Sequence, residues 1–134
     1  MKWQLLIAIG SAALAICGMP LHLAAQSPAP AKPKQFIYVL RLVPRLHAEA
    51  NWTAEDNAVL GRHFKRFQEA IASGQLILAG RTMEPGEKTF GIAIFEAADE
   101  AAARTFMEGD PAVTGGLMTA ELRPFAVALQ RKSP

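Results

Sequence analysis

A histidine lies within the apolar face of the longest amphipathic segment of the chain. His63 comes four residues after Val59 and four before Phe67, so at helical spacing the three side chains share one stripe. An imidazole in that position either bonds to a buried partner or lines a cavity. In a cavity, a neutral imidazole is suited to taking a proton from a ligand. The spacing alone leaves both interpretations open.

Few other side chains offer chemistry of their own. Asp110 stands between Gly109 and Pro111, where an aspartate is suited to shaping the turn that ends a helix. Arg81 lies near the end of a predicted strand and either points a cation into a cavity or forms a surface ion pair. Trp52 precedes the amphipathic segment, where it either covers a cleft or anchors packing.

The composition and motifs argue against several common chemistries. After the first 25 residues the chain has two histidines and no cysteine, which disfavours a zinc site of ordinary composition. The pair Gly115-Gly116 lacks the Lys-Ser/Thr that follows a phosphate-binding loop, and no Gly-x-Ser-x-Gly nucleophile motif is present. We therefore expect neither a metal nor a cofactor.

The N-terminal segment has the pattern of an export signal. Lys2 supplies a basic start, and residues 5–16 form an apolar run that is short for a membrane span. Small residues offer a cleavage site after Ala25. We predict a signal peptide over residues 1–25 and an exported protein, periplasmic or secreted, that has no membrane contact after cleavage. An uncleaved N-terminal anchor is the alternative.

Cleavage also changes the charge and cysteine content. Loss of Lys2 lowers Lys plus Arg from 14 to 13 against 12 Asp plus Glu, so the net charge falls from +2 to +1. So small a charge argues against nucleic-acid binding. Arg62, Lys65 and Arg66 lie close together but are predicted to face solvent on their helix. The only cysteine, Cys17, leaves with the signal, so no disulfide stabilises the exported chain.

The remaining chain divides into a tether and one domain. Residues 26–34 are rich in proline and predict an extended tether. Residues 35–131 then form a single domain of 97 residues. A domain of that size buries a modest core, so association with a partner would help to cover apolar surface.

The elements that must position these side chains follow the order β-α-β-β-α-β. Strands are expected at residues 36–40, 75–82, 89–95 and 119–129, with helices between Thr53 and Gly74 and from Asp99 to Gly109. Thr53 caps the first helix, and Asp56 can return a hydrogen bond to the Thr53 backbone. Gly74 suits a left-handed helix exit, and Pro124 confines the last strand to an edge or a bulge.

This order matches the ferredoxin-like fold, an α+β arrangement in which an antiparallel sheet carries two helices on one face. Because both helices cover the same face, the other face of the sheet needs cover of its own. In so small a domain a second copy of the sheet supplies that cover with the least additional structure. We therefore predict a homodimer.

With these elements in place, the chain resembles the YciI-like (YCII-related) domain family, dimeric α/β-barrel proteins of ferredoxin-like topology. The resemblance spans the folded domain and rests on the order and spacing of His63, residues 74–80, residues 90–96, Asp110-Pro111 and residues 122–125. Two positions depart from the family pattern. Arg81 stands where many members carry proline, and Ala112 where many carry phenylalanine. Both changes alter the shape and charge of a cavity rather than the fold.

The resemblance implies a His–carboxylate pair in a cleft near the dimer interface. Here the pair maps onto His63 and Asp110 as catalytic residues, with Arg81, Trp52 and Tyr38 as ligand contacts. One lineage of the family eliminates chloride from chlorinated hydroxyquinols. A small aromatic or anionic ligand is therefore expected, with lyase- or isomerase-type proton transfer if the protein is an enzyme. The alternative is a non-catalytic module that binds a ligand or partner and uses His63 for packing and dimer geometry.

Overall fold

A computed structural model describes residues 32–131. The predicted signal peptide, residues 1–25, and most of the predicted tether, residues 26–34, lie outside the described residues. The last tether residue, Lys34, already belongs to the first strand.

The described chain confirms the predicted order of the main elements. In chain order they are β1 (Lys34–Leu42), η1 (Pro44–Leu46), η2 (Glu49–Asn51), α1 (Ala54–Ala72), β2 (Leu76–Arg81), η3 (Gly86–Lys88), β3 (Phe90–Ala97), α2 (Glu100–Glu108), α3 (Pro111–Thr114) and β4 (Met118–Pro124). Here η denotes a short 3-10 helix. The η segments and the one-turn helix α3 were not predicted, because three or four residues are too few to show a hydrophobic period.

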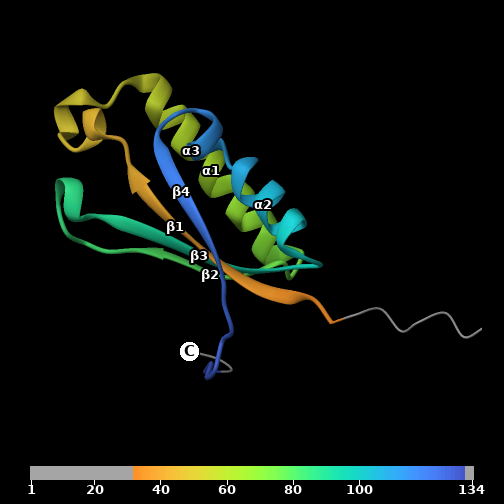
Figure 1. Cartoon of the computed structure of the whole chain (residues 1–134). Coiled ribbons are helices and arrows are strands. Elements are labelled where there is room, and N and C mark those ends of the chain that lie inside the picture. Colours follow the sequence, from red (N-terminus) through yellow and green to blue (C-terminus); the bar gives the residue numbers. More distant parts are fainter. Residues whose placement is uncertain (1–31, 132–134) are drawn as a thin grey trace, which may run out of the picture.

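The four strands form one antiparallel sheet in the order β2-β3-β1-β4, which is the ferredoxin-like topology. The helices lie together on one face of this sheet, as Figure 1 shows. Pro124 ends β4, which is an edge strand with a neighbouring strand on one side only. A proline is tolerated there because its missing N–H can face away from the sheet.

The core lies between the sheet and the helices, because every second side chain of β1 and β3 is buried on the face that the helices cover. Phe36, Tyr38 and Leu40 of β1 are at most 3% exposed, and they pack with Phe95 of β3 and Phe67 of α1. This alternation is the period-two pattern of a strand with one face in the core. It brings the Tyr38 side chain beneath α1 and α2.

The first turn of α1 is held by a capping box. The Asp56 N–H donates to the Thr53 hydroxyl at 3.1 Å, and the Thr53 N–H donates to the Asp56 carboxylate at 2.9 Å. Arg45 of η1 adds two bonds to the same carboxylate at 2.7 and 2.9 Å. These bonds, Arg45 first among them, hold the pKa of Asp56 well below its usual range. The start of α1 is thereby fixed against the loop that precedes it.

The opposite face of the sheet carries a row of aliphatic side chains, which we call the aliphatic row: Ile37, Val39, Leu78, Ile92 and Ile94. Their shared face follows from the strand register, which pairs Ile37 and Leu78 with Ile94, and Val39 with Ile92. In residues 32–131 no helix covers this row (Figure 1).

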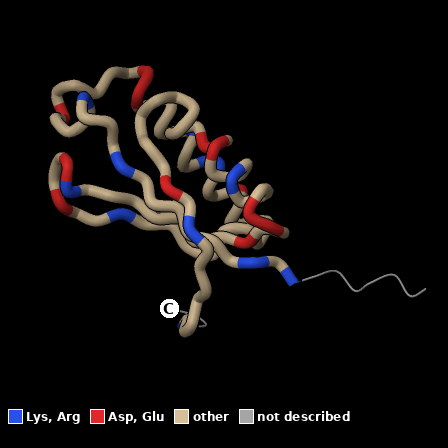
Figure 2. Tube along the Cα trace, viewed as in Figure 1, with Lys and Arg blue, Asp and Glu red and all other residues tan. Residues whose placement is uncertain are grey.

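The charged residues of the described chain are of mixed sign. Lys and Arg alternate with Asp and Glu over the helices and loops, as Figure 2 shows. Among the described helices, none combines the length and the hydropathy that crossing a membrane would require.

Candidate functional site

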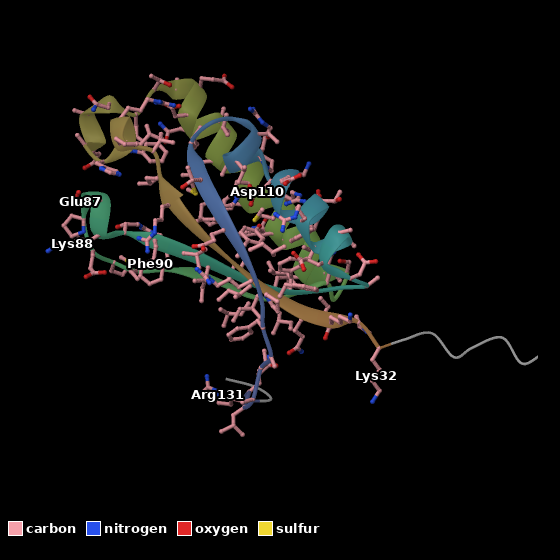
Figure 3. All side chains as sticks on the ribbon, viewed as in Figure 1. Lys32, Glu87, Lys88, Phe90, Asp110 and Arg131 are labelled. Carbon is pink, nitrogen blue, oxygen red and sulfur yellow. The ribbon has the colours of Figure 1, made fainter. Side chains whose placement is uncertain are left out.

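His63 faces the sheet from the middle of α1 and is only 5% exposed. Its Nδ1 lies 2.6 Å from Oδ1 of Asp110, and its ring centroid is 4.3 Å from that of Phe67. Asp110 comes from the turn between α2 and α3, close to α1 (Figure 3). The structure thus brings together the two residues that the family resemblance implied as a pair.

The Asp110 carboxylate is completely buried and accepts three hydrogen bonds. Oδ1 accepts from His63 and from the Ala112 N–H at 2.9 Å, and Oδ2 accepts from the Tyr38 hydroxyl at 2.8 Å. Burial alone would raise the pKa of Asp110, but the hydrogen bond and charge of His63, with the bonds from Ala112 and Tyr38, hold it below its usual value. The group is therefore a carboxylate at neutral pH.

The charge of Asp110 fixes the proton on the neutral His63 ring. A carboxylate oxygen only accepts hydrogen bonds, so Nδ1 of His63 carries the hydrogen that it donates to Asp110. The neutral ring then presents Nε2 as an acceptor. Within residues 32–131, the bond to Asp110 is the only hydrogen bond that the ring makes.

A cavity of about 680 Å³ lies between α1 and the sheet, with His63 in its wall. Its polar or ionisable lining side chains are those of Trp52, His63, Gln68, Arg81 and Thr89. The remaining lining residues are apolar: Leu40, Leu42, Leu60, Phe64, Phe67, Ile71, Leu76, Ala79, Gly80, Gly91, Ile92 and Met118. Ile92 touches the cavity although its position in the strand register belongs to the aliphatic row. The cavity is open to solvent on one side, where Phe64 and Ile71 are about half exposed. An apolar cleft with a few polar groups is typical of a small-molecule site.

Two of the three predicted ligand contacts, Arg81 and Trp52, line this cavity. Trp52 also donates from Nε1 to the Leu46 carbonyl at 3.1 Å, so the indole is both a packing anchor and part of the wall. Thr89 and Gln68, which the sequence did not single out, line the cavity as well. Gln68 follows Phe64, another residue of the cavity wall, by four residues on α1, and that spacing was the available signal.

Tyr38 does not line the cavity, contrary to its prediction as a ligand contact. Its side chain is fully buried and its hydroxyl is bonded to Asp110, behind the His63 ring. Burial first, and then the charge of Asp110, raise the pKa of Tyr38 far above its usual value. Tyr38 is therefore a protonated donor that orients the carboxylate.

Arg66 differs from its prediction as a solvated surface residue. Arg62 and Lys65 do lie at the surface, where they pair with Glu55 and Glu69. Arg66 instead donates from Nη2 to the Phe106 carbonyl at 2.6 Å, and its guanidinium lies 4.2 Å from the Phe106 ring centroid. Arg66 makes these contacts because α2 brings Phe106 beside it. Helical spacing within α1 does not reveal that neighbour.

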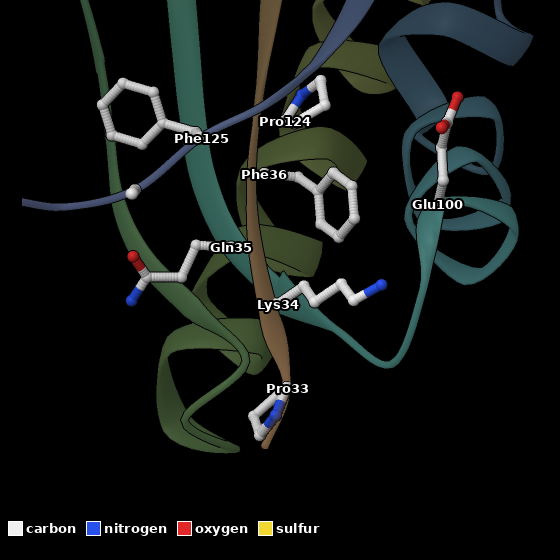
Figure 4. A pocket seen from close by; sticks show the side chains of 8 residues that line it. Pro33, Lys34, Gln35, Phe36, Glu100, Pro124 and Phe125 are labelled. Carbon is white, nitrogen blue, oxygen red and sulfur yellow. The ribbon is translucent and has the colours of Figure 1, made fainter. Parts of the chain in front are cut away.

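A second hollow, of about 520 Å³, lies where β1 begins, beside the segment after β4 (Figure 4). Its wall contains no histidine and carries the opposite charges of Lys34 and Glu100. We assign no chemistry to it. Within residues 32–131, no three histidine, cysteine, aspartate or glutamate side chains gather in a way that would hold a metal ion.

Comparison with protein families matches residues 38–126 to the YCII-related domain. Comparison with curated proteins found no match. The family match covers about two thirds of the 134 residues and includes His63, Asp110 and every residue of the cavity wall. The chain therefore belongs to the YCII-related domain family.

Proposed function

We propose that the protein binds a small aromatic or anionic molecule in the 680 Å³ cavity and that His63 acts on it as an acid and base. The observation that carries the proposal is the pairing of a cavity-lining histidine with a buried carboxylate. Nδ1 of His63 is committed to Asp110, so Nε2 is the nitrogen left for a ligand. The arrangement matches the acid–base part of a catalytic triad, in which a carboxylate orients the ring.

The proposed reaction is a proton transfer of the lyase or isomerase type. Nε2 takes a proton from a C–H or O–H group of the ligand, and the charge of Asp110 stabilises the imidazolium that forms. In an isomerisation the same proton returns to another ligand atom. In an elimination the electron pair from the broken C–H bond forms a double bond as a leaving group departs. One positioned base suffices for the first step of either reaction.

The alternative is a binding module in which His63 is structural. The close packing of the His63 ring on Phe67 and its low exposure favour this alternative. The two functions differ in what happens to the ligand, because a binding module leaves its C–H bonds unchanged.

Deuterium exchange separates the two. A panel of enolisable aryl ketones and aryl carboxylic acids is incubated with the protein in D2O, and NMR follows both binding and loss of C–H signals. We expect exchange in at least one bound compound, and no exchange with His63→Gln. Binding without exchange across the panel would support the binding module, and the absence of binding would contradict both.

His47 supplies the matched control. Its Nε2 lies 3.2 Å from the Leu42 carbonyl, and the residue is not part of the cavity wall. His47→Gln removes the same functional group and is expected to leave binding and exchange unchanged. His63→Gln should retain the wild-type circular dichroism spectrum, because a glutamine side chain can still donate to Asp110.

The proposal includes a homodimer formed by the aliphatic row. A charge at its centre, Ile94→Lys, should convert the dimer to a monomer in sedimentation measurements, because a buried lysine without a partner is costly. Met83→Lys is the control, since Met83 is 83% exposed and lies in the β2–β3 connection. A wild-type protein that is monomeric at micromolar concentration would contradict the dimer.

The proposal also includes export. When the full chain is produced in a bacterium, the intact mass of the released protein should correspond to a chain that starts at Gln26. A membrane-bound protein that keeps residues 1–25 would support the N-terminal anchor instead.

A further inference from the structure

We propose that the ligand is an organic anion, with an apolar body of aromatic size that fills the cavity and one carboxylate-like group that binds Arg81. This inference rests on the proposed function and specifies the ligand of the same cavity. It assigns Arg81 the role of selecting the anion. His63 faces the other part of the molecule.

The charge of the cavity wall points to an anion. Among the 17 lining residues the ionisable side chains are His63 and Arg81, and none is acidic. The nearest carboxylate to His63 is that of Asp110, which is buried and occupied by its three hydrogen bonds. A molecule in the cavity therefore meets a cation that no acidic lining residue offsets.

Arg81 is not satisfied by a carboxylate of its own chain. Of the eight arginines in residues 32–131, Arg45, Arg62, Arg104 and Arg123 each pair with a carboxylate, and no ion pair in that range involves Arg81. A guanidinium offers five N–H donors in a planar fork that suits a carboxylate. A ligand carboxylate would supply the acceptor.

The strand register directs Arg81 to the cavity side of the sheet. Arg81 of β2 pairs with Gly91 of β3, and Gly91 pairs in turn with Leu40 of β1. Directly opposed residues share a face, and Leu40 belongs to the core beneath the helices. Arg81 therefore shares that face with Leu40, while Gly91 between them has no side chain to fill the space.

The sheet beneath the cavity contributes small residues where the ligand body would lie. Ala79, Gly80 and Gly91 are the smallest lining residues, and Phe64, Phe67 and Trp52 supply aromatic surface. Small residues on one side and aromatic rings nearby suit a planar hydrocarbon body. A cavity of about 680 Å³ is within the range that holds molecules of one or two rings.

The test compares two probes that have the same shape and different charge, 2-naphthoate and its neutral amide, 2-naphthamide. Isothermal titration calorimetry gives the affinity of each, and the amide NMR signals of Gly80, Thr89 and Gly91 locate the bound probe. We expect wild-type protein to bind naphthoate about tenfold or more tightly than naphthamide, as a charge-assisted hydrogen bond would give.

Variants at Arg81 test whether this residue causes the preference for naphthoate over naphthamide. Arg81→Met should weaken naphthoate about tenfold and leave naphthamide unchanged, and Arg81→Lys should keep part of the preference because it keeps the charge. Arg104→Met removes an equal charge from α2, outside the cavity wall, and should keep the whole preference. Unchanged naphthamide binding shows that the folded cavity persists in each variant.

The outcomes separate this inference from the proposed function. Equal binding of the two probes by wild-type protein, or a preference that survives Arg81→Met, would overturn the inference and leave the cavity as a binding site. If neither probe moved the signals of Gly80, Thr89 and Gly91, the inference would fail together with the proposed function.

Discussion

Replacing Asp110 with asparagine tests the hydrogen-bond network directly, because the amide has nearly the same size and no charge. The Ala112 N–H points at Oδ1, so the amide oxygen must take that position and the NH2 group must face Tyr38. The oxygen then still accepts from His63. The geometry therefore predicts that Asp110→Asn retains the orientation and tautomer of His63.

The expected cost comes from the bonds that weaken. Two hydrogen bonds change from a charged acceptor to a neutral one, each losing roughly 1 kcal/mol. The Tyr38 hydroxyl, which is wholly buried, loses its acceptor, which costs about 1–3 kcal/mol. With partial relaxation the free energy of unfolding should fall by about 2–4 kcal/mol at pH 7. In a domain of this size that lowers Tm by about 10–20 °C.

The cost should also depend on pH. Because the pKa of Asp110 is lower in the folded chain than in the unfolded one, the carboxylate stabilises the fold above the unfolded value, about 3.9. That contribution is lost as the pH falls through the folded pKa. The stability gap between wild type and Asp110→Asn should thus be full above about pH 5 and narrow toward pH 2.

Urea unfolding at a series of pH values from 7 to 2 measures this gap. A gap below about 0.5 kcal/mol at pH 7 would refute the account of Asp110 as a hydrogen-bonded buried carboxylate. A gap that stayed constant, or widened, as the pH fell would refute the direction of its pKa shift.

Three further substitutions test the hydrogen bond behind the site and the packing of α1. Tyr38→Phe leaves Oδ2 of Asp110 without its donor, so urea unfolding should show a loss of about 1–3 kcal/mol, and an unchanged value would contradict the bond. Gly115→Ala should cost about 1–3 kcal/mol because its Cβ would lie 2.7 Å from a methyl group of Val59. Gly61→Ala, in an open position on α1, should instead raise stability by about 0.5–1 kcal/mol, and equal effects of the two alanines would contradict this packing.

The elements that carry local signals could be predicted from the sequence. Thr53 and Asp56 form the expected capping box, and Gly74 leaves α1 with a φ of 79°. Pro124 lies on an edge strand as its missing N–H requires. Each of these features depends on residues a few positions apart, so the sequence pattern is sufficient.

The role of Asp110 was predicted in part. The sequence suggested a turn that ends a helix, whereas the aspartate also caps the next helix, α3, by accepting from the Ala112 N–H. A cap residue followed by Pro111 is a known helix start, so the signal was present and was assigned only to the preceding helix. The pairing with His63, 47 residues away, rested on the family resemblance.

Contacts between distant elements could not be predicted. The alternation of β1 places Tyr38 in the core, but its bond to Asp110 spans 72 residues and depends on how α2 crosses the sheet. Arg66 was assigned to solvent for the same reason, since only the path of α2 brings Phe106 against it. Helical spacing predicts the face of the helix on which a side chain lies. It does not predict which residues of another helix will contact that face.

The most direct test of the central claim is the tautomer of His63, measured by long-range 1H–15N NMR at an alkaline pH where neutral rings predominate. We predict that His63 carries its proton on Nδ1, bonded to Asp110, with Nε2 free. His47, whose Nε2 faces the Leu42 carbonyl, should show the opposite tautomer in the same spectrum. A proton on Nε2 of His63 would contradict the account, because that nitrogen could then take no proton from a ligand.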